Sequence, residues 1–369
     1  MNRPSLRLAA CTALVLLAAC SSKAPPAAID ASPDQQESAK EARRYLSQPL
    51  VAEIYTADPS AHIWDGKIYV YPSHDIDGTT PQDDLGAHFE MRDYRVLSMD
   101  TIGGPVTVHP VALDVSQVPW ADRQMWAPDA ARKNDTYFLY FPAKDKQGAF
   151  RIGVATSKSP IGPFEPRPEP IKGSYSIDPA VFTDADGRTY MYFGGIWGGQ
   201  LQRNTTGSYD PNGSKTDLQA DDQPALSAKV ALLTDDMLEF AEKPRDVVVL
   251  DENDKPLLGG DHDRRFFEAS WMHKYNGKYY FSYSTGDTHY IVYAIGDSPY
   301  GPFKYAGRIL EPVEGWTTHH SIVEWDGRWW LFYADSQLSG QTRLRNAKVT
   351  ELFYNPDGTI KTIDPFVHE

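Results

Sequence analysis

The sequence contains little cysteine and has fewer basic than acidic residues. Only two cysteines occur among the 369 residues, Cys11 and Cys20, and both lie within the first 20 residues. A chain cleaved before Cys20 therefore has no second cysteine with which to form an internal disulfide. Lysine and arginine number 36 against 50 acidic residues, which gives a net charge of −14. This balance argues against nucleic acid or an anionic lipid surface as a partner, because both require a basic protein surface.

Two common kinds of functional motif are also missing. The sequence has no glycine-rich loop of the kind that cradles phosphate, and no cysteine/histidine cluster with the spacing of zinc ligands. Aromatic residues, in contrast, are plentiful, with 15 Phe, 9 Trp and 21 Tyr. Such residues suit the cores of β-sheets and also form flat surfaces on which sugars stack.

The first 20 residues have the pattern of an export signal. Arg3 and Arg7 form a positive segment, residues 8–17 form an apolar core, and Leu17-Ala18-Ala19-Cys20 is a small-residue cleavage site. We predict a lipoprotein-type signal peptide over residues 1–20, ending at Cys20, with an ordinary secretory signal as the alternative. Both interpretations predict an exported protein. The first predicts a periplasmic or cell-surface lipoprotein that contacts the membrane only through a lipid anchor at Cys20.

The rest of the chain consists of a short polar segment and one repetitive domain. Residues 21–45 are rich in Ala, Pro, Ser and charge, which predicts a flexible tether. Beyond them, a polar turn followed by an aromatic-rich strand recurs five times, at residues 65–71, 134–140, 186–192, 276–282 and 326–332. Residues 155–164 also match residues 294–303. Repeats at this spacing predict an all-β fold, a five-bladed β-propeller formed as a single domain by residues 46–369.

Four acidic residues, each in a different repeat, stand just before a predicted strand: Asp58, Asp129, Asp178 and Glu268. Taken singly, each is typical of a turn or cap residue. A propeller, however, brings the starts of its innermost strands together around one axis, where several carboxylates would repel one another. Functional sites use such crowding to separate pKa values. Cleavage of a glycosidic bond needs this arrangement, since one carboxylic acid protonates the leaving oxygen while a carboxylate activates water on the opposite face.

An ordered set of motifs resembles glycoside hydrolase family 43 over roughly residues 50–365. The motifs are Ala57-Asp58-Pro59, Trp126-Ala127-Pro128-Asp129, Asp178-Pro179-Ala180-Val181-Phe182, Phe267-Glu268-Ala269-Ser270-Trp271 and His319-His320-Ser321-Ile322-Val323. The resemblance implies a five-bladed propeller that acts on arabinose- and xylose-containing polysaccharides. It implies that Asp58 is the general base, that Glu268 is the general acid, and that Asp178 raises the pKa of Glu268 and positions it. The family often has Gly-Pro after the catalytic Glu, where this chain has Ala269-Ser270.

The roles of the remaining candidate residues stay open between two interpretations. Trp126 and Asp129 either bind the sugar or lock a blade. The resemblance places Arg345 against substrate hydroxyls, with a surface arginine as the alternative. Trp197 either lines the pocket or packs in the core beside a glycine turn, and His74 is a further candidate at the pocket border. His319, by resemblance, lies beside a structural calcium ion on the axis. Since calcium prefers oxygen ligands, waters would complete the shell.

We therefore predict a monomeric, inverting glycosidase of the β-xylosidase or α-L-arabinofuranosidase type, which cleaves xylose- or arabinose-containing oligosaccharides derived from hemicellulose. A retaining, invertase-type propeller would need an Asn-Asp-Pro-Asn-like motif, where this chain has Thr56-Ala57-Asp58-Pro59-Ser60. The alternative from another class is a non-catalytic propeller that binds glycans. That function does not require acids on three separate blades.

Overall fold

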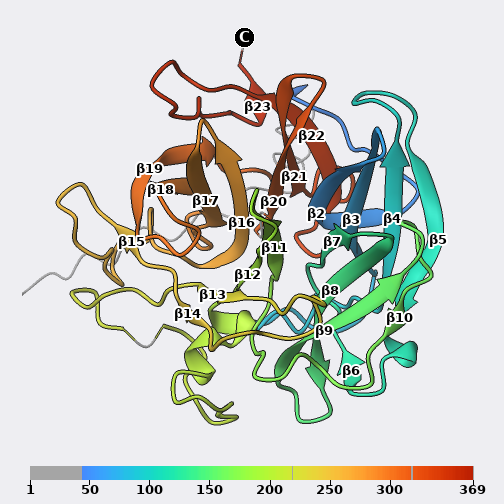
Figure 1. Ribbon diagram of the computed structural model, residues 1–369, viewed down its shortest axis with the longest axis horizontal. Coiled ribbons are helices and arrows are strands. Elements are labelled where there is room, and N and C mark those ends of the chain that lie inside the picture. The colour runs from blue at the N-terminus through green and yellow to red at the C-terminus, as the bar shows by residue number, and fades with distance from the viewer. Residues whose placement is uncertain (1–43, 218, 317–318, 369) are drawn as a thin grey trace, which may run out of the picture. The chain divides into compact units, whose positions relative to one another are not determined.

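The computed structural model describes residues 44–217, 219–316 and 319–368. The predicted signal peptide and nearly all of the predicted tether lie outside these residues. The described chain contains short 3-10 helices but no α-helix, and no helix in it is long and apolar enough to span a membrane. Its strands form one two-stranded sheet and five larger sheets, and the larger ones are arranged around a centre, as Figure 1 shows. The prediction of an all-β, five-bladed propeller is confirmed.

Each blade is built mainly from antiparallel neighbours that follow one another in the sequence. The first blade contains β2 (Tyr55–Trp64), β3 (Lys67–Asp75), β4 (Asp93–Met99) and β5 (Thr107–Asp114); the second contains β6 (Ala121–Arg123), β7 (Asp129–Lys133), β8 (Thr136–Asp145), β9 (Phe150–Ser157) and β10 (Glu165–Pro166). The third contains β11 (Ala180–Thr183), β12 (Thr189–Phe193), β13 (Lys229–Leu232) and β14 (Arg245–Asp246). The fourth contains β15 (Val249–Leu250), β16 (Glu268–Tyr275), β17 (Lys278–Ser284), β18 (Ile291–Gly296) and β19 (Phe303–Leu310), and the fifth contains β20 (His320–Trp325), β21 (Arg328–Asp335) and β22 (Asn346–Leu352).

The five repeated turns join the innermost strand of each blade to the strand beside it. In the first, fourth and fifth blades both turn residues have positive φ: Asp65-Gly66, Asn276-Gly277 and Asp326-Gly327. Two-residue turns of this kind match the right-handed twist of the strands that they connect. The third blade differs, because Thr183 pairs with Thr189 and the loop is longer.

The blades close into a ring through their innermost strands. Each of β2, β7, β11, β16 and β20 contacts the next, and β20 contacts β2 again. The start of the domain also joins the last blade, where the backbone N–H of Leu50 donates to the carbonyl of Ala347 at 2.8 Å. Near the chain end, β1 (Arg44–Tyr45) pairs with β23 (Phe366–Val367). The ring therefore fastens the two ends of the domain to each other.

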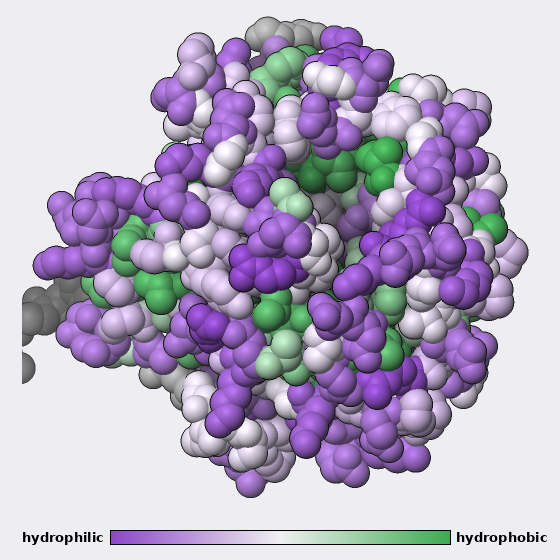
Figure 2. All heavy atoms as spheres, viewed as in Figure 1, coloured by the Kyte–Doolittle hydropathy of each residue, from purple (hydrophilic) through white to green (hydrophobic). Residues whose placement is uncertain are grey.

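The similarity between residues 155–164 and residues 294–303 is explained by contacts between blades. The hydroxyl of Tyr71 in β3 donates to the carbonyl of Pro160, and the hydroxyl of Tyr192 in β12 donates to the carbonyl of Pro299. Pro160 and Pro299 occupy equivalent places in residues 155–164 and 294–303. Each match is thus a loop that accepts a hydrogen bond from a buried tyrosine of the preceding blade. Polar side chains cover most of the face in Figure 2, in line with the excess of acidic residues.

Candidate active site

The three predicted catalytic acids lie at irregular points of the inner strands. Asp58 has a φ of 49° and lies at a bulge where the pairing of β2 with β3 shifts between Ala57 and Ser60. Asp178 has a φ of 56° and precedes β11. Glu268 begins β16, and the next residue, Ala269, has a φ of 65° at a second shift in pairing. Left-handed backbone at non-glycine residues is strained, and such strain is concentrated at functional sites.

One cavity of about 220 Å³ collects these acids from the first, third and fourth blades. Its wall contains seven of the residues predicted from the sequence: Asp58, Trp126, Asp178, Trp197, Glu268, His319 and Arg345. It also contains residues that the sequence interpretation missed, among them Asp83, His88, Phe89, Ile177, Phe267 and Trp316. Asp129 and His74 are not in its wall.

Asp58 is held by two donors from different blades. Its Oδ1 accepts a hydrogen bond from Nη1 of Arg345 at 2.9 Å, and its Oδ2 accepts one from the hydroxyl of Ser73 at 2.6 Å. Both Asp58 and Arg345 are buried. The guanidinium carbon of Arg345 lies 5.0 Å from the ring centroid of Phe89. Arg345 is therefore a buried residue of the site, and the prediction of a surface arginine is wrong.

Glu268 and Asp178 form a buried carboxyl pair with raised pKa values. Burial raises the pKa of Glu268 to about 8, and the Asp58 carboxylate adds to the effect. Burial also raises the pKa of Asp178 well above its usual range, with contributions from Glu268 and Asp58. Oδ2 of Asp178 accepts a hydrogen bond from the backbone N–H of Ala269 at 2.9 Å, whereas the Glu268 carboxyl has no such fixed donor within the described chain. Burial thus disfavours the ionised form of both carboxyl groups, while the N–H of Ala269 favours the ionised form of Asp178.

Asp129 joins three blades and does not face the cavity. Its carboxylate accepts hydrogen bonds from His62 in β2 at 2.7 Å, from its neighbour Ala130 at 2.7 Å and from the backbone of Val181 in β11. This geometry agrees with the blade-locking interpretation of Asp129. His74, likewise, directs Nδ1 to Asp93 at 2.7 Å. The residue of β3 that reaches the site is the next one, Asp75, which binds Arg345.

Two aromatic walls enclose the cavity. Trp126 donates from its indole nitrogen to the carbonyl of Phe89 at 3.0 Å, and the two rings meet edge to face. Trp197 donates to Asp217 at 2.9 Å and its ring lies nearly parallel to that of Trp316, with centroids 6.2 Å apart. Trp126 and Trp197 are thus partly structural, but each presents a surface to the cavity.

A loop between β3 and β4 closes one side of the cavity. A Cβ atom on Gly86 would lie 2.7 Å from the ring of Trp126, and one on Gly198 would lie 2.7 Å from the carbonyl oxygen of Leu85. The loop over residues 76–92 therefore presses against Trp126 and the turn at Gly198. The only sequence signal for this wall was the length of that loop, because long loops in compact domains are often functional.

Within the described part of the chain, the side chains around His319 do not form a protein-ligated calcium site. Among the described residues, no group of three or more His, Cys, Asp or Glu side chains could hold a metal ion. Nδ1 of His319 accepts the backbone N–H of His320 at 2.9 Å, so the proton of the neutral ring is on Nε2. Nε2 lies 3.9 Å from Oδ2 of Asp178 and has no hydrogen-bond partner in the described chain. A protonated nitrogen cannot ligate a metal, so His319 does not fit as a direct ligand.

Comparison with known proteins identifies the family. The model of glycosyl hydrolases family 43 matches residues 47–360. Xylosidase/arabinosidase 43A of Humicola insolens is 59% identical over 331 residues, which cover 86% of this chain and 99% of that protein. A xylosidase/arabinosidase of Bacteroides ovatus is 55% identical over 329 residues, which cover 88% of this chain and 98% of that protein.

A solved structure agrees closely in fold. It is a family 43 β-xylosidase/α-arabinofuranosidase from a compost microbial metagenome, in complex with xylotriose and in a calcium-free form. It is 66% identical to this chain, has a TM-score of 0.87, and is matched over 88% of this chain and 99% of its own. The chain belongs to glycoside hydrolase family 43, and it is a glycosidase.

Proposed function

We propose that this protein releases terminal β-D-xylosyl and α-L-arabinofuranosyl residues from short oligosaccharides derived from hemicellulose, with inversion at the anomeric carbon. The observation that carries the proposal is the set of three buried carboxyl groups from three blades around one cavity, one of which holds a proton near neutral pH. The choice of xylose and arabinose as the released sugars is supported by the relatives named xylosidase/arabinosidase.

The chemical step divides between two residues. Glu268, protonated up to about pH 8, donates its proton to the glycosidic oxygen as the bond to the anomeric carbon breaks. Asp58 removes a proton from water, which attacks the anomeric carbon from the opposite face. We assign Asp178, whose Oδ2 accepts the N–H of Ala269, the role of the third carboxylate, whose charge when ionised would favour the protonated form of Glu268. Glu268 then leaves this step ionised and Asp58 leaves it protonated, so a proton must pass back through solvent before the next turnover.

The closed side of the cavity supports release of a terminal sugar. The loop at Leu85 and Gly86 packs closely against Gly198 and Trp126, which narrows that side of the cavity. We expect xylohexaose labelled at its reducing end to be shortened one residue at a time. Early appearance of mid-length products would instead establish endo cleavage.

The activity is tested with nitrophenyl β-D-xylopyranoside, nitrophenyl α-L-arabinofuranoside and xylobiose, together with the Glu268→Gln variant. Nuclear magnetic resonance of the first sugar released reports its anomeric form. We expect hydrolysis by the wild type, α-xylose as the first product from xylobiose, and loss of xylobiose hydrolysis in the variant. β-Xylose as the first product would refute inversion. A wild type that is inactive on all three substrates but binds xylotriose would support the glycan-binding alternative.

We also propose that calcium, when bound, is held on the axis through water molecules. The negative charges of Asp58 and Asp178 would attract the ion, and His319 would not be a direct ligand. The test is the shift in melting temperature on adding calcium to chelator-treated protein. We expect His319→Ala to retain the shift, whereas its loss in that variant would establish direct ligation.

Export and anchoring at Cys20 remain proposals from the sequence, as does the monomeric state. Expression of the full precursor in a bacterial host, followed by detergent phase partitioning, tests the anchor. We expect the wild type in the detergent phase and Cys20→Ser in the aqueous phase. Size-exclusion chromatography with light scattering of the domain without its signal tests for a mass of one chain.

A further inference from the structure

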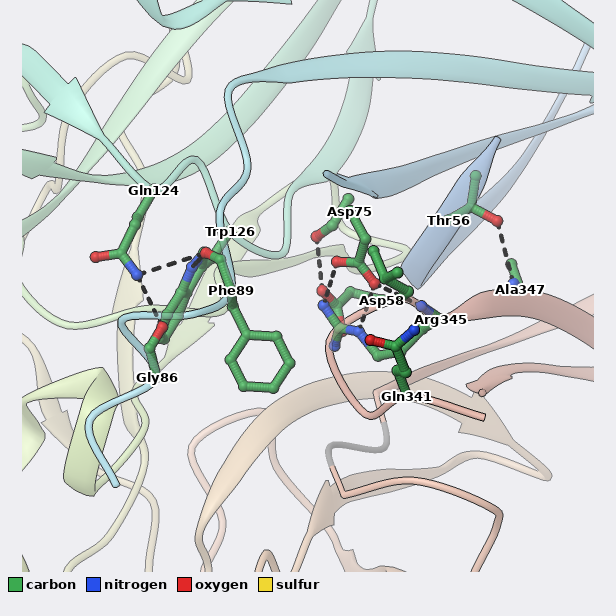
Figure 3. Close-up of polar contacts among 12 residues, drawn as sticks. Thr56, Asp58, Asp75, Gly86, Phe89, Gln124, Trp126, Gln341, Arg345 and Ala347 are labelled. Carbon is green, nitrogen blue, oxygen red and sulfur yellow. Dashed lines mark hydrogen bonds and ion pairs between the residues drawn. The ribbon is translucent and has the colours of Figure 1, made fainter. Parts of the chain in front are cut away.

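Asp75 is a fully buried carboxylate whose hydrogen bonds in the described chain all come from Arg345. Oδ2 accepts hydrogen bonds from Nε of Arg345 at 2.9 Å and from its backbone N–H at 2.8 Å, and Oδ1 accepts one from Nη2 at 2.8 Å. The two residues are 270 positions apart in the chain. Asp75 ends β3 in the first blade, whereas Arg345 immediately precedes β22 in the fifth. Figure 3 shows both side chains beside Asp58.

This clamp determines how Arg345 meets the base. Two of the five N–H groups of the guanidinium point to Asp75, and a single N–H, from Nη1, reaches Asp58 at 2.9 Å. Phe89 covers a face of the guanidinium, with its ring centroid 5.0 Å from the central carbon. The planar group therefore has little freedom to turn. Two N–H groups have no acceptor in the described chain and remain for a ligand in the cavity.

An unclamped Arg345 would bind Asp58 differently. Arginine and carboxylate form bidentate pairs readily, with two parallel hydrogen bonds. Such a pair would engage both oxygens of Asp58 and compete with Ser73 for Oδ2, which would turn the carboxylate away from its present orientation. A general base held in this way would be weak and misplaced.

We propose that Asp75 is a positioning residue for the hydrolysis: it fixes Arg345 so that one N–H orients Asp58 and the free N–H groups face the sugar. This inference rests on the proposed function and adds a residue that acts only through Arg345. The charges that face Asp58 are those of Arg345 and Asp75 on one side, and Glu268, Asp178 and the imidazole of His319 across the cavity. Burial raises the pKa of Asp75, and the charge and hydrogen bonds of Arg345 oppose that rise.

The first variant is Asp75→Asn, which keeps the shape but turns one acceptor into an NH₂ group facing the guanidinium. We expect kcat/KM for xylobiose to fall about 100-fold, as misplaced catalytic groups do. The acid limb of the pH–rate profile should move to lower pH, because the substitution removes the Asp75 charge beside the base. A purely structural role for Asp75 would lower activity or stability without moving that limb, and an unmoved limb overturns the proposal.

A matched control is available in the fifth blade. Asp335 ends β21 as Asp75 ends β3, is equally buried, and pairs with Lys348 away from the cavity. Asp335→Asn removes a buried carboxylate from a cation in the same way. We expect it to lower the melting temperature while leaving the pH–rate profile of the folded enzyme in place. An acid limb that moves equally in both variants would refute a specific role for Asp75.

A double-mutant cycle with Arg345→Met separates positioning from all other effects. Because Asp75 acts through Arg345, adding Asp75→Asn to Arg345→Met should change kcat/KM less than about threefold. The same addition should raise the melting temperature, since it removes a buried charge that has lost its partner. Equal losses of activity from Asp75→Asn in both backgrounds would overturn the proposal.

The cycle also distinguishes this proposal from the proposed function. An active wild type with additive losses refutes only the role of Asp75. A wild type inactive on xylosides and arabinosides refutes both, even if the melting temperatures couple as expected. If Asp75→Asn alone fails to fold, Arg345→Met can still be compared with Arg345→Met/Asp75→Asn. A kcat/KM that is a further 100-fold lower in the double variant refutes the inference.

Discussion

Replacing Glu268 with glutamine should stabilise the protein while it removes hydrolysis of natural substrates. Burial raises the pKa of Glu268 from 4.5 to about 8 in the folded chain. Below pH 4.5 the folded and unfolded chains both hold this proton, so the residue has no effect on the pH dependence of stability. Between pH 4.5 and 8 the unfolded chain releases the proton and the folded chain keeps it. The free energy of unfolding therefore falls as pH rises, and glutamine, which does not titrate, escapes this loss.

The size of the gain follows from the same values. Stability changes by about 1.36 kcal/mol for each pH unit over which only one state is protonated. The Glu268→Gln variant should gain about 2 kcal/mol over the wild type at pH 6 and at most about 5 kcal/mol at pH 8, relative to the difference at pH 4.5. Because Asp178 competes for protons in the same cluster, the measured gain should lie below these values.

Urea denaturation at pH 4.5, 6 and 8 measures this gain. The matched control is Glu324→Gln, since Glu324 lies on β20 and is exposed to solvent. We expect the control to differ little from the wild type at every pH. A gain for Glu268→Gln that is equal at pH 4.5 and pH 8, or absent at pH 8, would refute a buried, protonated Glu268. On xylobiose the same variant should lose a factor of 10² to 10⁴ in kcat, the usual contribution of a general acid.

Three further predictions concern the pH profile, the cavity wall and the joint between blades. The basic limb of kcat/KM for xylobiose should fall to half near pH 8, where Glu268 loses its proton; a limb beyond pH 10 would exclude Glu268 as the acid. Gly198→Ala places a Cβ atom 2.7 Å from the carbonyl oxygen of Leu85 and should displace that loop. We expect KM for xylotriose to rise about tenfold, which corresponds to about 1.4 kcal/mol of strain. An unchanged KM would show that the loop does not shape the pocket. Asp129→Asn should lower the free energy of unfolding by about 3 kcal/mol and leave KM unchanged, because Asp129 joins blades and does not line the cavity. A raised KM with unaltered stability would contradict this prediction.

The blades and the catalytic acids could be predicted because their signals are local. Four of the five repeats have an Asn-Gly or Asp-Gly turn and one has Asn134-Asp135. Such turns favour a hairpin whatever surrounds them, so the repeats determine the number of blades. Asp58 and Glu268 lie near the starts of inner strands and Asp178 just precedes one, so ring closure alone brings them to the axis. Nothing beyond the order of the repeats is needed for that inference.

The residues around the acids could not be predicted, because their roles depend on register and on distant partners. His74 and Asp75 are neighbours on β3, and alternating side chains of a strand point to opposite faces. The face that reaches Arg345 is set by the shift in pairing at Asp58, which no local pattern reveals. Asp129, in turn, begins an inner strand as Glu268 does, but His62 and the backbone of Val181 bind it within the ring.

The two buried aspartate–cation pairs of this propeller show why the site uses arginine. Asp335 pairs with Lys348, a compact cation whose single nitrogen suits one carboxylate beside Asn346. Arg345 must serve two carboxylates at once, and only a guanidinium can direct three nitrogens to different acceptors in one plane. An Arg345→Lys variant keeps the charge, but its single nitrogen can pair well with either Asp75 or Asp58 and not with both. That variant would keep the positive charge of Arg345 but lose the geometry that keeps Asp58 and Asp75 apart. The charge alone therefore does not explain how the general base Asp58 is positioned.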